Sequence, residues 1–171
     1  MLAFLCGGME FAPDGGRDWR VKMRQWLEEY LNHTAYDPVV ETAKTMSPED
    51  LQEFRSWKAT DLDRHRKATR FIINHDLDVM QGRTDYVICL WDQAAVRGGG
   101  SHAELTVAYR KGLPVYLVTE MPIEEVSGWV VGCTTKIFSS FDELKSFLSA
   151  TYGKDARQRA FWGPRSGARR D

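Results

Sequence analysis

Two carboxylates follow a strand-like apolar run and a glycine run in the middle of the chain. Asp92 comes directly after the apolar run 86–91, and Glu104 follows the glycine triplet 98–100 and Ser101. A strand, a glycine loop and a helix in this order are typical of a parallel sheet, which binds ligands at the carboxyl ends of its strands. Two acids there could stabilise a sugar-like cation while backbone amides hold an anion. This stretch is the first candidate for chemistry.

Glu104 has two interpretations. Ser101 and Glu104 have the spacing of a capping box, in which both side chains close the start of a helix. The glycine triplet, however, costs backbone entropy on folding and is not needed for a cap. It is explained if a ligand must approach the backbone closely. Because a helix amino end keeps a nearby carboxylate ionised, Glu104 is predicted to be a nucleophile, with the cap as the alternative.

Two aspartates are predicted to support Glu104. Asp92 ends the apolar run 86–91, and Asp76 lies in the segment before the same run. Either could instead be structural, since aspartate is common in turns and on solvated helix faces. If both reach the carboxyl edge of the sheet, the site contains three acids.

Glycines and arginines after the first apolar run form a second candidate site. Glycine amides and guanidinium groups are typical phosphate ligands. The loop should face Glu104 across a crevice, although a flexible loop with exposed arginines would have the same composition. The predicted substrate- and phosphate-binding residues are Gly7, Gly8, Met9, Arg17, Arg20, Gly98, Gly99, Gly100 and Ser101.

The elements that must position these residues alternate between strand and helix patterns. Strands are expected at 2–6, 35–40, 86–91, 114–119 and 136–138, and helices at 18–31, 61–81, 101–111, 122–131 and 141–152. Ser47 and Pro48 should begin a further helix within the poorly patterned segment 41–60. This alternation predicts an α/β fold with a doubly wound, five-stranded parallel sheet, flavodoxin-like order 2-1-3-4-5 and helices on both faces.

Composition indicates one globular domain. The chain has 171 residues, 43% of them hydrophobic and 27% charged, with a formal net charge of −1. This charge offers no general attraction to polymeric nucleic acid or an anionic membrane. No apolar run approaches the length of a membrane span, and the apolar start is too short for a signal peptide. We expect a cytoplasmic domain over 1–152 and a basic tail, 153–171, that is mobile or covers a neighbouring subunit.

The cysteines and histidines do not have a metal-binding pattern. The three cysteines are widely spaced, which indicates buried thiols in a reducing compartment. Combined with the four histidines they show no recognisable zinc-ligand spacing. The prediction is no metal and no cofactor.

Three segments resemble the nucleoside 2-deoxyribosyltransferase superfamily, which includes N-glycosidases of deoxynucleoside 5′-monophosphates. They span most of residues 2–120, and the glycine–glutamate–proline block is the most specific. The segments are Phe4-Leu-Cys-Gly-Gly-Met9, the series Asp76…Asp85-Tyr-Val-Ile…Asp92, and Gly100-Ser-His-Ala-Glu104-Leu-Thr-Val-Ala108 followed by Lys111-Gly-Leu-Pro-Val115.

The resemblance implies that Glu104 attacks C1′ and forms a glycosyl-enzyme intermediate. It implies that Asp76 and Asp92 hold sugar hydroxyls or help to protonate the base, and that Ser101 and the first loop bind a 5′-phosphate. It also implies a homo-oligomer. The sequence departs from the family where many members have tyrosine in the first strand, because this chain has Phe4.

The predicted activity is therefore cleavage or transfer at the N-glycosidic bond of a (deoxy)nucleoside or its 5′-monophosphate. Hydrolase and transferase remain open, as do the base and the 5′ group. One alternative is a non-catalytic nucleotide-binding module or sensor. Another is a phosphoribohydrolase with a Gly-Gly-x-Gly-Thr-x-x-Glu motif, although the spacing of the glycines and Glu104 in this chain is one residue shorter than in that motif. A flavodoxin or phospho-acceptor relative is disfavoured, since the first strand ends in Cys-Gly-Gly rather than in acids.

Overall fold

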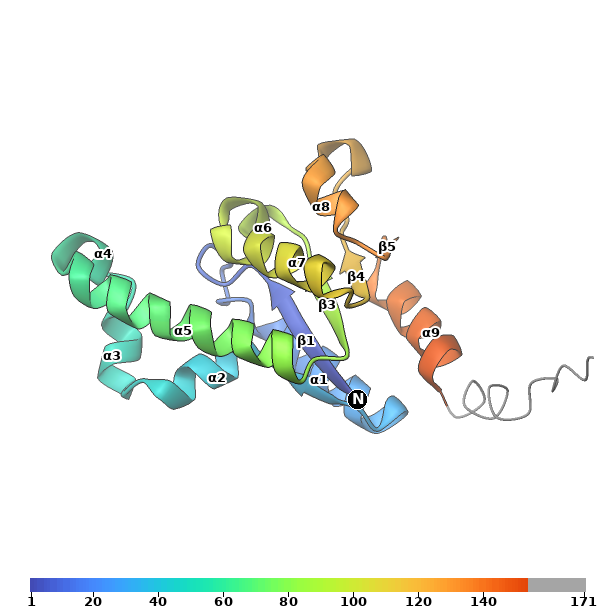
Figure 1. Cartoon of the computed structure of the whole chain (residues 1–171), viewed down its shortest axis with the longest axis horizontal. Helices are drawn as coiled ribbons and strands as arrows, with labels where there is room; N and C mark the ends of the chain where they lie inside the picture. The colour runs from blue at the N-terminus through green and yellow to red at the C-terminus, as the bar shows by residue number, and fades with distance from the viewer. Residues whose placement is uncertain (154–171) are drawn as a thin grey trace, which may run out of the picture.

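A five-stranded parallel sheet forms the centre of the computed structural model, which describes residues 1–153 (Figure 1). The strand order is β2-β1-β3-β4-β5, and neighbouring strands are parallel throughout. The predicted doubly wound fold and its order 2-1-3-4-5 are confirmed. The predicted basic tail, apart from Gly153, lies outside the described residues. The strands are β1 (Leu2–Gly7), β2 (Thr34–Tyr36), β3 (Tyr86–Leu90), β4 (Val115–Val118) and β5 (Lys136–Phe138).

Helices cover both faces of this sheet. The principal ones are α1 (Arg17–Trp26), α5 (Leu62–Gly82), α7 (Gly99–Lys111) and α9 (Phe141–Tyr152). Helix α1, its π-helical continuation η1 (Leu27–Leu31) and α9 pack on one face, and α5 and α7 pack side by side on the other (Figure 1). The shorter elements are α2 (Pro38–Thr45), α3 (Pro48–Glu53), α4 (Trp57–Thr60), α6 (Gln93–Arg97), η2 (Ile123–Glu125) and α8 (Gly128–Gly132).

Side chains of β1 and β3 alternate between these two faces. Cys6 and Cys89 are register partners and pack toward α5 and α7, whereas Leu5 and Ile88 pack toward α1 and α9. The alternation follows from the two-residue period of a strand. It decides which helices each residue can meet at the carboxyl edge of the sheet.

The second strand is shorter than expected. The predicted strand 35–40 was wrong at its end, because β2 stops at Tyr36 and Pro38 begins α2. The side chain of Asp37 caps this helix by accepting a hydrogen bond from the Val39 amide at 3.0 Å. Proline suits the first helical position because the amide it lacks would be unbonded there.

The poorly patterned segment 41–60 folds into short helices that reach the first loop. Ser47 caps α3 as expected, accepting from the Asp50 amide at 3.1 Å. Arg55 donates to the Met9 carbonyl at 3.0 Å, and Lys58 pairs with the carboxylate of Glu10. The segment therefore holds the loop that follows β1.

Within residues 1–153, no helix is long and apolar enough to cross a membrane.

Candidate functional site

Helix α7 begins two residues earlier than predicted. Gly98 is its N-cap and no side chain caps it, so Ser101 and Glu104 both lie inside the helix. The capping-box interpretation of these two residues was therefore wrong. The helix can begin at Gly99 because the chain after α6 already leaves Gly98 in an extended conformation, as an N-cap requires. Glu104 thus lies in the second turn.

Glu104 is half-buried, and its carboxyl lies beside Cys6, close to the carboxyl edge of β1. Burial raises its pKa to about 7, the nearby Cys6 thiol and Arg20 guanidinium lower it, and the charge on Asp76 raises it. A carboxyl in this environment is partly protonated at neutral pH. A cation placed against it would favour its ionised form.

Asp76 is the second acid of this group. It comes from α5 and is only 7% exposed. Burial raises its pKa to about 6, while the Tyr36 hydroxyl, which donates to its Oδ1 at 2.5 Å, and the charges on His75 and Arg20 lower it. The structure therefore brings the predicted pair Glu104 and Asp76 together.

Tyr36 is a site residue that the sequence analysis did not identify. It ends β2 in register with Phe4 and stacks on that ring, with centroids 5.1 Å apart and planes inclined by 21°. Burial and the adjacent Asp76 raise the pKa of its phenol well above the usual range. The neighbouring strand thus places a tyrosine hydroxyl beside Phe4 and against Asp76. Its signal in the sequence is a tyrosine in the predicted second strand, which the strand order 2-1-3-4-5 places next to the strand of Phe4.

Replacing Tyr36 with phenylalanine should raise the pKa of Asp76 above its wild-type value. The substitution removes a hydrogen bond that favours the ionised carboxylate, whereas the ring can keep its stacking on Phe4. Carboxyl NMR titration of wild type and variant measures the change. Tyr86→Phe is the matched control, since its hydroxyl bonds to His33 on the opposite face. An unchanged Asp76 titration in Tyr36→Phe would contradict the observed bond.

Asp92 lies on the other face of the sheet. Trp91 packs with Cys89 toward α7, so the next side chain turns toward Leu90 and α1. Its Oδ1 accepts from the Ala95 amide at 2.9 Å and caps α6. The side chain lines a cavity whose walls include neither Glu104 nor Asp76. The structure does not bring the three predicted acids together.

The glycine triplet leaves the start of α7 open. A Cβ added at Gly99 or Gly100 would meet no atom within 4 Å, whereas one at Gly98 would lie 3.3 Å from the Ala94 carbonyl oxygen. Both Gly99 and Gly100 are exposed, and the Ser101 side chain is buried behind them. With no side-chain cap, the first amides of α7 are available to an anion.

The glycines of the first loop serve packing. A Cβ on Gly8 would come within 2.6 Å of Ala94 and Ala95, so the loop lies directly against α6. Gly7 has φ of 153° and faces the Leu90 carbonyl oxygen and the Trp19 ring at 3.1 Å from its added Cβ. These two glycines close the space between the loops that leave β1 and β3.

The two predicted arginines have different environments. Arg17 is exposed at the start of α1. Arg20 is fully buried and donates to the carbonyls of Leu5, Gly7 and Gly16 at 3.1, 2.9 and 2.6 Å. The Arg20 guanidinium thus organises the loop backbone. Met9 is half-buried, and its carbonyl is held by α3–α4 as described above.

The two raised pKa values predict a loss of stability toward neutral pH. Glu104 and Asp76 bind protons more tightly in the folded than in the unfolded chain, so the free energy of unfolding should fall from about pH 4 to pH 7. Glu104→Gln removes one of these groups and should be more stable than wild type at pH 8, on the order of 2 kcal/mol.

Urea unfolding at pH 4, 6 and 8 tests this pH dependence. Glu120→Gln, at an exposed position, is the control and should follow the wild-type curve. A wild-type stability that rises from pH 4 to pH 8, with Glu104→Gln parallel to it, would contradict the desolvated environment of Glu104.

Comparison with known proteins supports the fold. No family model and no curated protein matches the sequence. A crystal structure of a conserved protein from Enterococcus faecalis V583 is similar, with a TM-score of 0.56 and 15% sequence identity, over 93% of this chain and 98% of that chain. This likeness shows that the two chains share a fold.

Proposed function

We propose that the protein cleaves the N-glycosidic bond of a (deoxy)nucleoside or its 5′-monophosphate, with Glu104 as nucleophile. The observation that carries the proposal is the pair of desolvated carboxyls, Glu104 and Asp76, next to the open amino end of α7. Such a pair suits a reaction that develops positive charge on a sugar.

In the proposed reaction a Glu104 carboxylate oxygen bonds to C1′ as the bond from C1′ to the base nitrogen breaks. The electron pair of the broken bond stays on the base, and a ring nitrogen of the base takes up a proton from solvent. Water or a second base then attacks C1′ and loses a proton to solvent, while the bond from C1′ to Glu104 breaks and frees the carboxylate. The oxocarbenium-like cation would stabilise ionised Glu104, offsetting the burial that raises its pKa.

Asp76 has a supporting role in this proposal. Held by the Tyr36 hydroxyl, its carboxylate can accept a hydrogen bond from a sugar hydroxyl. Both acids act in their ionised forms, so kcat/KM should rise with pH until it levels off above about pH 7. Asp92 is assigned no step, since it lies on the other face.

The amino end of α7 is the proposed anchor for the 5′ group. The open backbone at Gly99 and Gly100 and the uncapped first turn suit a phosphate or a hydroxyl. Anchoring the 5′ end would hold C1′ against Glu104, which lies one turn further along the same helix. The scheme requires no cofactor.

A panel of nucleosides and 5′-monophosphates, with and without a free acceptor base, tests the activity. Chromatography should show free base from at least one substrate. A new nucleoside in the presence of acceptor would identify a transferase, and free sugar a hydrolase. Ligand-dependent thermal stabilisation with no product from any substrate would overturn catalysis in favour of a nucleotide-binding module.

A further inference from the structure

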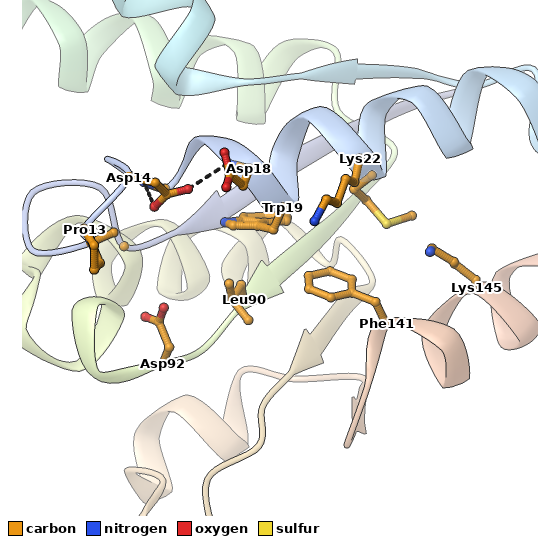
Figure 2. A pocket seen from close by; sticks show the side chains of 13 residues that line it. Pro13, Asp14, Asp18, Trp19, Lys22, Leu90, Asp92, Phe141 and Lys145 are labelled. Carbon is orange, nitrogen blue, oxygen red and sulfur yellow. Dashed lines mark hydrogen bonds between the residues drawn. The ribbon is translucent and has the colours of Figure 1, made fainter.

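A cavity of about 360 Å³ lies between α1 and α9 at the carboxyl edge of the sheet (Figure 2). Its volume lies within the range of small-molecule sites. The residues that matter for its chemistry are Asp14, Trp19, Lys22, Asp92, Phe141 and Lys145.

This cavity is distinct from the Glu104 site. Leu90 and Met23, which line it, belong to the α1–α9 side of the sheet, whereas Glu104 lies next to Cys6 on the α5–α7 side. The contact of Gly8 with Ala94 closes the edge between the two sides. A ligand in the cavity would therefore not contact Glu104.

One end of the cavity is cationic. Figure 2 shows the amino groups of Lys22 and Lys145 directed toward the space beside Phe141. Lys145 is 3.6 Å from the exposed carboxylate of Asp142, a weak pairing, and Lys22 has no ion pair among residues 1–153. Two converging ammonium groups without a strong internal partner suit an anion such as phosphate.

The middle of the cavity is aromatic. Trp19 and Phe141 stack on each other with ring centroids 5.6 Å apart and planes inclined by 25°. Both are partly buried and come from the two helices that form the walls. Trp19 stacks on Phe141, and the Arg20 guanidinium lies 4.6 Å from the Trp19 ring centroid, so a planar ligand ring would bind by burying apolar area against the remaining surface of this aromatic pair.

The other end carries three carboxylates, Asp14, Asp18 and Asp92, on the side away from the lysines (Figure 2). The two oxygens of Asp14 each accept from a loop amide, that of Gly16 at 2.9 Å and that of Asp18 at 2.8 Å, so this carboxylate is held by its own loop. Asp92 uses Oδ1 for the Ala95 amide, which leaves Oδ2 to accept from a ligand N–H or hydroxyl. A small anion without hydrogen-bond donors would not match this end.

We propose that the cavity binds a nucleoside monophosphate or a chemically similar molecule, a planar ring with donor groups and a phosphate. The phosphate contacts Lys22 and Lys145, the ring lies against Trp19 and Phe141, and a donor bonds to Asp92. The site is separate from the proposed catalytic centre and does not depend on its activity.

Titration of Glu104→Gln with adenosine 5′-monophosphate tests this site, because that variant should not consume the ligand. The readout is the indole N–H resonance of Trp19, assigned with Trp19→Phe. It should shift in a saturable manner. Adding Lys22→Ala and Lys145→Ala should weaken the binding at least about tenfold. Lys67→Ala with Lys111→Ala, which removes equal charge from exposed positions on α5 and α7, should change it little.

Adenosine and inorganic phosphate separate the contributions to binding. Adenosine should bind equally to the Lys22/Lys145 variant and its parent, and phosphate alone should not shift the Trp19 resonance. An unshifted Trp19 resonance with adenosine 5′-monophosphate, or equal losses in the two lysine pairs, would overturn the site. Absence of base release by the wild type would refute only the proposed catalytic function.

Discussion

Glu104→Gln is expected to lower the rate of base release by about 10³-fold or more. Glutamine keeps the size of the side chain but cannot form the bond to C1′. The protein should stay folded, because the wild-type carboxyl is desolvated and its replacement by a neutral amide removes an unfavourable charge. Chromatographic assay of released base at pH 8 measures the effect.

Two further variants distinguish Glu104 from its neighbours. Asp76→Asn should also lose activity, whereas Asp92→Asn should affect the rate far less, because Asp92 lines the cavity on the other face. Glu120→Gln serves as the exposed control. Wild-type rates in Glu104→Gln would remove Glu104 from the mechanism, and loss in Asp92→Asn equal to that in Asp76→Asn would contradict the two-sided arrangement.

Arg20→Met is expected to lower the free energy of unfolding by about 3–5 kcal/mol. Methionine fills much of the volume but leaves the carbonyls of Leu5, Gly7 and Gly16 without their donor. It also leaves Asp37, 2% exposed and 3.9 Å from the guanidinium, as a buried charge without its partner. Urea unfolding at pH 7 measures the loss.

Substitution of Asp37, the ion-pair partner of Arg20, tests whether the lost stability comes from the unpaired charge. The Asp37 Oδ2 has no hydrogen-bond partner in the described part of the chain, so the double variant Arg20→Met/Asp37→Ala should recover part of the loss. Recovery is incomplete because Asp37 also caps α2. Arg17→Met, at an exposed position of the same helix, should change stability by less than about 0.5 kcal/mol. A loss for Arg20→Met no larger than this would contradict a structural role for its guanidinium.

The strand order was predictable because five apolar runs alternate with helical patterns, and few topologies satisfy short, right-handed crossovers. Local boundaries were harder to predict. Pro38 was interpreted as an irregular strand end, but it begins a helix that Asp37 caps. Ser101 and Glu104 have the spacing of a cap, yet the chain enters the helix at Gly99 without one. In both places an extended residue, Asp37 or Gly98, precedes the first helical residue and determines where the helix begins.

The candidate site was partly predictable for a similar reason. Asp76 and Glu104 were expected at the carboxyl edge, and the structure places them together. Asp92 was expected beside them because it follows the end of β3 closely. Successive side chains of an extended chain point to opposite faces of the sheet, however, and because Trp91 points toward α7, Asp92 points away from it. Tyr36 was missed because its contact with Asp76 joins residues 40 positions apart through the register of β2 with β1.

The close contact of Gly8 with Ala94 and Ala95 also has an evolutionary consequence. A side chain at position 8 would meet the backbone of Ala94 and Ala95 and push α6 away from the first loop, so selection should keep glycine here even while residues on either face of the sheet change.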